Sequence, residues 1–479
     1  MKNIYIVLIL ITLFSCDISP TKGKKNTFKR NLDRGSEKAL IISKDLGNSD
    51  ELDYLEEYIQ LESITIRDID GVEIPDKIVN YEKIVDVAIS NCNLENIPGF
   101  VYKCINIKKF TFESNKLREI PDELLYCSKL ESLNLSKNQI KTIPNGLIKL
   151  KLLKELYLGY NEINTIPEWM NELMYLESLY INKNKLQTIP EWFNNFTNLR
   201  VLFLNYNQIS LCSSKLDNMD KLYWLDLSNN LLSSIDINFV NKAYEIIDLS
   251  NNNFKKTPEG LYVLPKLRNF TISGNNLTEI PSEIFELPRI EYIDYSNNEI
   301  STLPSIINAS RKIREVNLSK NKIISLPERC EVFNVTSELN LSNNELSNLP
   351  MFTNKEMITV ILDLSCNKFT HFPQGLTVMH KLSALLLNFN AISEITCDLS
   401  NMTGLTSIQL QKNKMTLLPY KCFTAPNLES LFLNDNNIGD ISTDETMYPR
   451  SVLIDVTGNS ISRSKTNELV DKGVWIRNY

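Results

Sequence analysis

The chain has 479 residues, of which 43% are hydrophobic and 23% are charged, and its formal net charge is −7. This composition is that of a folded protein, and the mildly acidic balance argues against a nucleic-acid-binding protein, which needs a basic surface. Only two histidines are present, His371 and His380, although histidine is the commonest acid–base catalyst near neutral pH and a common zinc ligand. We therefore predict a protein that is not an enzyme and has no cofactor and no metal.

The chain begins with the pattern of an export signal. A basic residue, Lys2, precedes an apolar run from Ile4 to Phe14, which is too short for a membrane-spanning helix of about 20 residues. A run of this length is typical of a secretory signal. The sequence therefore predicts a signal peptide over residues 1–15.

The signal ends in Leu-Phe-Ser followed by Cys16. This ending resembles the bacterial lipobox, which implies that Cys16 becomes the mature N-terminus and carries a lipid. The alternative is an ordinary cleaved signal in which Cys16 has no role. The polar, basic stretch that follows has no apolar periodicity and cannot bury enough surface to offset the cost of ordering. We predict a lipid-anchored flexible tether over residues 16–49.

From about residue 61 the sequence repeats every 23 residues. Three consecutive copies read LESLNLSKNQIKTIP, LKELYLGYNEINTIP and LESLYINKNKLQTIP. Asparagine occupies position nine in sixteen copies from Asn115 to Asn459, and Ile69 and Cys92 occupy it in two earlier ones, giving 18 copies. One step, from Asn230 to Asn252, is 22 residues long.

Each repeated position has a physical role. Positions four to six alternate apolar, outward and apolar residues, which predicts a short strand whose leucines face a core. No single copy can bury its leucines, but stacked copies form one continuous core and one parallel sheet. The asparagine amide can satisfy backbone groups at the bend that follows the strand. The proline after it suits the start of an outer arc of short helical turns, where no strand-to-strand hydrogen bond is needed.

The pattern L-x-x-L-x-L-x-x-N-x-L followed by Ile-Pro resembles the 23-residue leucine-rich repeats of the plant intracellular Ras-group type, which also occur in bacterial surface proteins. The chain is similar in this respect to bacterial leucine-rich-repeat lipoproteins. The resemblance implies an α/β horseshoe-shaped solenoid over residues 50–479, with a parallel concave sheet and short helical or irregular convex segments. It also implies a protein partner on the concave face.

The ends of the repeat region need covers, because the terminal copies of a solenoid expose core. An acidic helix is predicted over residues 50–58 at the N-terminal end. At the C-terminal end, a final helical turn is predicted over residues 465–471, and Trp475 is predicted to cover the core.

Several cysteines occupy positions of the repeat that face the core, and we predict them to be buried thiols. Cys104 and Cys127 lie one copy apart, so the sequence leaves open whether they are free or form a disulfide. The others are Cys212, Cys330 and Cys422.

The predicted contact site lies on the outward strand residues, because the inward ones belong to the core. Position five is aromatic in three consecutive copies, and neighbouring outward positions add three more aromatic residues. These six, named the aromatic surface, are Tyr157, Tyr160, Tyr180, Phe203, Tyr206 and Trp224. Such side chains dominate protein interfaces. Asp226, Asp248 and Asp294 follow at position five as an acidic flank. Leu386, Phe389 and Phe432 form a smaller second candidate.

The sequence thus predicts a monomeric, lipid-anchored protein at the cell envelope or surface that binds another protein. One alternative is a secreted leucine-rich-repeat effector of a eukaryotic parasite. Another is a carbohydrate-binding wall protein, because stacked tyrosines also bind sugar rings.

Overall fold

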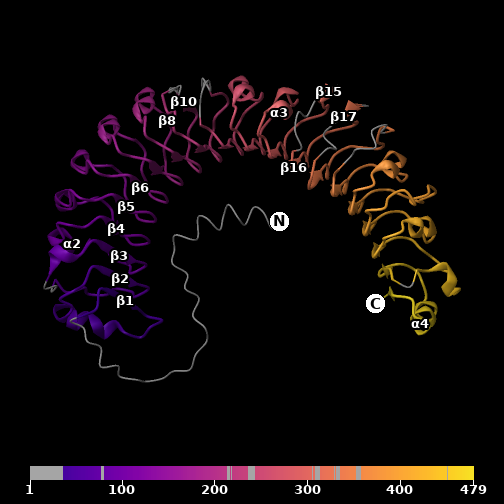
Figure 1. Cartoon of the computed structure of the whole chain (residues 1–479), viewed down its shortest axis with the longest axis horizontal. Helices are drawn as coiled ribbons and strands as arrows, with labels where there is room; N and C mark the ends of the chain where they lie inside the picture. Colours follow the sequence, from indigo (N-terminus) through magenta and orange to yellow (C-terminus); the bar gives the residue numbers. More distant parts are fainter. Residues whose placement is uncertain are drawn as a thin grey trace.

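The structure is a computed structural model that describes residues 36–76, 80–212, 216, 218–235, 243–304, 306–307, 313–327, 329–330, 335–351, 358–449 and 451–478. The predicted signal peptide and Cys16 lie outside the described residues. The described chain forms a single arc, with strands along its inner side and short helices along its outer side (Figure 1). The predicted solenoid with a concave sheet is confirmed.

The inner side is one parallel sheet of 20 strands, in which each strand pairs with the next in chain order. The strands are β1 (Ala39–Ser43), β2 (Ser63–Arg67), β3 (Asp86–Ser90), β4 (Lys109–Thr111), β5 (Ser132–Asn134), β6 (Glu155–Tyr157), β7 (Ser178–Tyr180), β9 (Val201–Phe203), β11 (Trp224–Asp226), β12 (Ile246–Asp248), β13 (Asn269–Thr271), β14 (Tyr292–Asp294), β16 (Glu315–Asn317), β18 (Glu338–Asn340), β19 (Ile361–Asp363), β20 (Ala384–Leu386), β21 (Ser407–Gln409), β22 (Ser430–Phe432), β23 (Leu453–Asp455) and β24 (Ile476–Arg477). The 18 strands β2 to β23 of this sheet are the 18 predicted copies.

The outer side consists mainly of single turns of helix. They are η1 (Ser49–Glu57), η2 (Tyr81–Lys83), α2 (Phe100–Lys103), η3 (Asp122–Tyr126), η4 (Asn145–Lys149), η5 (Glu168–Glu172), η6 (Glu191–Asn195), η7 (Glu259–Val263), α3 (Glu283–Glu286), η9 (Gln374–Val378), η10 (Tyr420–Thr424), η11 (Glu445–Met447) and α4 (Arg463–Asp471). Two pairs of two-residue strands complete it: β8 (Thr188–Ile189) with β10 (Leu211–Cys212), and β15 (Ile306–Ile307) with β17 (Arg329–Cys330).

The repeated proline starts the outer arc as predicted. Pro121 precedes η3 with φ −72° and ψ 145°, an extended geometry that proline favours and in which its missing N–H is not needed. Pro144, Pro167 and Pro190 precede η4, η5 and η6 in the same way. In these four copies the chain therefore turns from sheet to helix at the same point.

The leucine positions form one continuous core. In the copy that contains β6, Leu153, Leu156, Leu158 and Ile163 are all fully buried. Burial of one such side chain stabilises a fold by about 1.5–3 kcal/mol. The 18 copies therefore hold together through contacts with their sequence neighbours.

Position nine forms a ladder of buried asparagines. The Asn298 amide donates to the carbonyls of Tyr295 and Ser296 in its own copy, at 3.1 and 3.2 Å, and to that of Ile272 in the preceding copy at 3.1 Å. Its Oδ1 atom accepts from the Leu277 N–H at 3.0 Å. The predicted role of the asparagine, which joins neighbouring copies through their bends, is thus confirmed.

Position eight was not singled out from the sequence, yet it is conformationally demanding. In all 18 copies this residue has a positive φ, between 51° and 74°, a region that favours glycine, asparagine and aspartate. Only Gly274 and Gly458 are glycines there. Larger residues such as Tyr160, Tyr206 and Phe389 adopt the same conformation at an energetic cost.

The sheet begins earlier than predicted. Strand β1 pairs with β2 in register, and its Leu40 and Ile42 side chains are buried in the core. The boundary of the flexible tether at residue 49 is therefore wrong, because residues 39–43 belong to the solenoid. The Leu40-Ile42 alternation was the signal, but this segment lacks the asparagine that marks sixteen of the 18 copies.

The two ends of the solenoid are capped, but only partly by the residues that the sequence predicted. Helix η1 contributes the buried Leu52 and Leu55 at the N-terminal end. At the C-terminal end, α4 and β24 close the core with Leu469 and Ile476. Trp475 does not cover it: its side chain is 61% exposed, because strand alternation points its neighbours inward instead.

The cysteines at core positions are mostly buried, as predicted. Cys104 and Cys127 are buried free thiols whose sulfurs lie 3.4 and 3.8 Å from the carbonyl oxygens of Phe100 and Val101. Burial raises the pKa of Cys104 to about 12 and that of Cys127 to about 11, which makes both unreactive. Cys422 is buried, whereas Cys212 is only partly buried, and the Cys330 side chain lies outside the described residues.

Candidate functional site

The aromatic surface lies on neighbouring strands in register. The pairing of β6, β7 and β9 places Tyr157, Tyr180 and Phe203 side by side. The rings of Tyr157 and Tyr180 stack with centroids 4.5 Å apart and planes at 10°. Phe203 then packs edge-on against Tyr180 at 4.9 Å and against Trp224 at 4.8 Å. The structure thus brings the predicted position-five residues and Trp224 into one continuous row.

Phe203 has a different role from its neighbours. It points out of the sheet as predicted, but only 7% of its surface is exposed, because the rings of Tyr180 and Trp224 flank it. Tyr157, Tyr180 and Trp224 are half-buried, so they present more ring surface to the solvent than Phe203, which packs between Tyr180 and Trp224.

The residues at position eight of the same copies form a second row of side chains, three residues after Tyr157, Tyr180 and Phe203 in the sequence. Tyr160 and Tyr206 are 44% and 49% exposed. The Lys183 ammonium sits between them, 4.5 Å from the Tyr160 ring centroid and 4.7 Å from that of Tyr206, which is cation–π geometry. Lys183 was not predicted as a site residue. The signal was present, since it occupies position eight between two tyrosines.

Both tyrosines of the row are uncharged at physiological pH, as tyrosine ordinarily is, and burial raises their pKa further. Burial raises the pKa of Tyr180 to about 12, and burial with the nearby Glu155 raises the pKa of Tyr157 well above its usual range. The Tyr157 hydroxyl is already bonded to Glu155, so this residue offers chiefly the apolar area of its ring.

The predicted acidic flank lies directly beside the aromatic row. Asp226 pairs across the strands with Phe203 on one side and with Asp248 on the other. The Asp226 carboxylate accepts hydrogen bonds from the Ser228 N–H at 2.9 Å and hydroxyl at 2.7 Å. Burial and the negative charge of Asp248 raise the pKa of Asp226 to about 7. Burial, together with the charge of Asp294, also raises the pKa of Asp248.

This raised pKa predicts a pH-dependent stability. The pKa of Asp226 is about 7 in the folded state, against 3.8 for the ordinary side chain, so the folded state binds the proton more tightly. The stability that the protonated Asp226 contributes is then lost as pH rises from about 4 to about 7. Asn317 makes the same bonds to Ser319 at this position of another copy, so Asp226→Asn should keep the geometry.

We expect the difference between the urea midpoint of Asp226→Asn and that of the wild type to increase in favour of the variant as pH rises from 4 to 8. The measurement is a series of urea melts over that range. Parallel curves for the two proteins would mean that Asp226 has an ordinary pKa.

The second predicted candidate, Leu386, Phe389 and Phe432, lies near the C-terminal end of the same face on β20 to β22. Phe389 is 48% exposed, and the Lys412 ammonium lies 4.7 Å from its ring centroid. This arrangement repeats that of Lys183 and the tyrosines. The concave sheet therefore carries two aromatic regions of similar construction.

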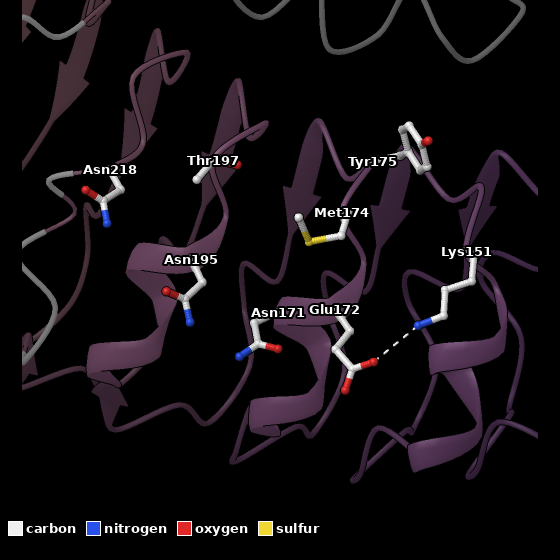
Figure 2. Close-up of a pocket in the computed structure, with 8 residues that line it drawn as sticks. All are labelled: Lys151, Asn171, Glu172, Met174, Tyr175, Asn195, Thr197 and Asn218. Carbon is white, nitrogen blue, oxygen red and sulfur yellow. Dashed lines mark hydrogen bonds and ion pairs between the residues drawn. The ribbon is translucent and has the colours of Figure 1, made fainter.

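The outer side carries a shallow hollow of about 520 Å³ between the ends of the short helices. Figure 2 shows its lining residues on η5, η6 and the loops that follow the helices, where Lys151 and Glu172 pair at 3.3 Å. The lining contains no histidine, cysteine or aspartate. Among the residues that the structure describes, no group of three or more histidine, cysteine, aspartate or glutamate side chains could hold a metal. The predicted contact residues lie on the concave sheet and not in this hollow.

Comparison with known proteins supports the fold independently. The sequence model of the family described as leucine rich repeat matches residues 105–163, 128–186, 174–232 and 265–323. These segments of the chain are leucine-rich repeats. No curated protein sequence matches it significantly. Within the described residues, no helix has both the length and the apolar character to cross a membrane.

Solved leucine-rich-repeat proteins share its shape. One from Leptospira interrogans is 24% identical with a TM-score of 0.69, over 83% of this chain and 96% of that one. The plant peptide hormone receptor RGFR1, in complex with RGF2, is 23% identical with a TM-score of 0.66, over 88% and 74%. YopM from Yersinia enterocolitica is 22% identical with a TM-score of 0.56, over 84% of each chain. At these identities the likeness shows the fold, which is typical of protein-binding modules.

Proposed function

We propose that this leucine-rich-repeat protein is a non-enzymatic, monomeric binding module of the cell envelope that holds a partner protein on its concave sheet. The observation that carries the proposal is the continuous aromatic surface across β6, β7, β9 and β11. Tyrosine and tryptophan supply large contact areas at a small cost in side-chain entropy, and they are enriched among the residues that dominate binding energy.

The geometry favours a protein partner over a glycan. A sugar ring binds to the open face of an aromatic ring, but Tyr157 and Tyr180 turn their faces toward each other at 4.5 Å. Tyr160 and Tyr206 are engaged by the Lys183 ammonium. Mixed aromatic, hydroxyl and charged groups of this kind suit the surface of a protein.

Photo-crosslinking on intact cells tests this proposal. A benzophenone amino acid in place of Tyr206 would report on the concave face, and the same amino acid in place of Tyr126 is the control, because Tyr126 is 70% exposed but belongs to η3 on the outer side. We expect a discrete cross-linked protein from position 206 and none from position 126. Equal products from both positions, or a product at position 206 that only glycosidases release, would contradict a concave protein-binding face.

We further propose that Cys16 anchors the protein to a membrane by its lipid. The support is the short apolar run that ends in Leu-Phe-Ser before Cys16. Metabolic labelling with a clickable fatty acid should mark the wild type, and the label should be lost completely in Cys16→Ala. Equal labelling of both proteins would remove the anchor from the proposal and leave a secreted protein.

A further inference from the structure

The hollow on the outer side is built from the same positions of successive copies. A tight turn follows each short helix there: the Met174 N–H donates to the Glu172 carbonyl at 2.9 Å, and the Thr197 N–H donates to the Asn195 carbonyl at 2.9 Å. Because neighbouring copies stack in register, the residues at these turns form a row. The hollow of about 520 Å³ lies along this row (Figure 2).

Three asparagine side chains in the lining are not used by the fold. Asn171, Asn195 and Asn218 come from three successive copies, and within the described chain their side-chain amides make no hydrogen bond. By contrast, Asn198 on the same side has a structural role, since its amide donates to the Met174 carbonyl at 2.7 Å. The three amides of the hollow are therefore available to a ligand, each with donors and an acceptor.

Tyr175 supplies an open aromatic face in the same hollow. Its side chain is 58% exposed, and its ring has no aromatic or cationic neighbour among the described residues. The tyrosines of the concave face differ, because their rings face one another or Lys183. Tyr126 on the outer side differs as well, because the Lys149 ammonium lies 5.7 Å from its ring centroid. The open face of an aromatic ring is negative and attracts the C–H groups of a sugar ring.

The charges of the lining indicate a neutral ligand that is bound and not cleaved. Among the described residues that line the hollow, Lys151 is the only cation and Glu172 the only anion, and the two pair at 3.3 Å. The hollow therefore has no net charge with which to attract an ionic group. Hydrolysis of a glycosidic bond ordinarily needs two carboxylates, and this lining contains one.

We propose that this hollow binds a short, neutral carbohydrate chain. One sugar ring stacks on Tyr175, and the hydroxyl groups of the chain exchange hydrogen bonds with Asn171 and Asn195. Each amide both donates and accepts, which matches adjacent hydroxyl groups of a sugar. The volume of about 520 Å³ lies within the range of about 300–1,000 Å³ that is typical of small-ligand sites. This site is separate from the aromatic surface and does not depend on the proposed protein partner.

An array of neutral oligosaccharides, probed with the full chain, identifies the ligand. The array includes the trisaccharides of glucose, mannose and N-acetylglucosamine, and titration calorimetry gives the affinity of those that bind. Tyr175→Ala and Asn171→Ala each remove one part of the site. Tyr126→Ala is the matched control, because it removes an exposed tyrosine of the outer side that does not line the hollow. Tyr206→Asn is a second control, on the concave face.

We expect at least one oligosaccharide to bind, with an affinity that falls at least tenfold in both site variants and is unchanged in both controls. Thermal melts of the same samples confirm that each variant is folded. The proposal is overturned if no oligosaccharide binds, or if binding survives in both site variants. Loss of binding in Tyr206→Asn alone would overturn it too, and would place the carbohydrate on the concave face, against the proposed function.

A protein in the hollow is the alternative to a carbohydrate. A benzophenone amino acid in place of Tyr175 distinguishes the two on intact cells. We expect cross-linked material that glycosidases degrade. A discrete protein whose cross-link resists glycosidases would overturn the carbohydrate site and leave the concave protein site standing.

Discussion

Replacement of Asn298 by leucine should lower the free energy of unfolding by about 3 kcal/mol or more. The amide makes four hydrogen bonds that join two copies of the repeat, and leucine can make none of them. Each buried backbone group left without a partner costs about 1–3 kcal/mol, and the bend gives water little access because Asn298 is 6% exposed. The measurement is the urea midpoint, followed by circular dichroism.

Ser296→Ala is the matched control for this change. Ser296 lies two residues away, and its N–H bonds to Asp294 through the main chain, which alanine preserves. We expect a loss under about 0.5 kcal/mol. Equal midpoints for Asn298→Leu and Ser296→Ala would mean that the asparagine ladder does not hold the copies together.

The repeat made much of the fold predictable from sequence. Each copy has a fixed phase, so the sequence alone assigns the asparagine column and the outward strand positions. The pairing of Tyr157, Tyr180 and Phe203 follows from that assignment. Cys92 illustrates the same logic, because its thiol donates to the Ser90 carbonyl at 3.2 Å in place of an asparagine. A periodic core leaves little freedom for a different register.

Features that depend on contacts between copies were less predictable. Phe203 was expected to be open to a partner, but its exposure depends on how the Tyr180 and Trp224 rings turn. In the core, the Tyr295 hydroxyl lies 3.1 Å from that of Thr257, 38 residues away, and Thr257 replaces the usual isoleucine before proline. Tyr295 and Thr257 each replace the usual apolar residue of their positions, and each finds its polar partner in the other. Neither residue by itself predicts this contact.

The candidate site was predicted as a row of residues but not as a set of interactions. The strand alternation gave the outward direction, and the aromatic residues gave the place. The role of Lys183 depends on its distances to the rings of Tyr160 and Tyr206, which the sequence does not give. The positive φ at position eight was not predicted either. Sixteen of the 18 residues at this position are not glycine, so the residue type does not reveal the backbone conformation.

Loss of Tyr160 and Tyr206 should sharply weaken binding without harming the fold. Both side chains are exposed and both hold a positive φ, so Tyr160→Asn and Tyr206→Asn place a residue that favours this conformation, as Asn229 does in a neighbouring copy. Truncation of an interface anchor costs about 2 kcal/mol or more of binding, which is roughly thirtyfold in affinity. Phe203 is unsuitable for this test, because its buried ring supports its neighbours.

The most direct test of a concave protein-binding face is the affinity of the Tyr160→Asn, Tyr206→Asn double variant for the protein captured by cross-linking at position 206. Titration calorimetry gives the affinity, and a thermal melt of the same sample reports on the fold. We expect a loss of thirtyfold or more with a melting temperature equal to or above that of the wild type. Wild-type affinity in the double variant, with the fold intact, would contradict the assignment of the aromatic surface as the site of binding.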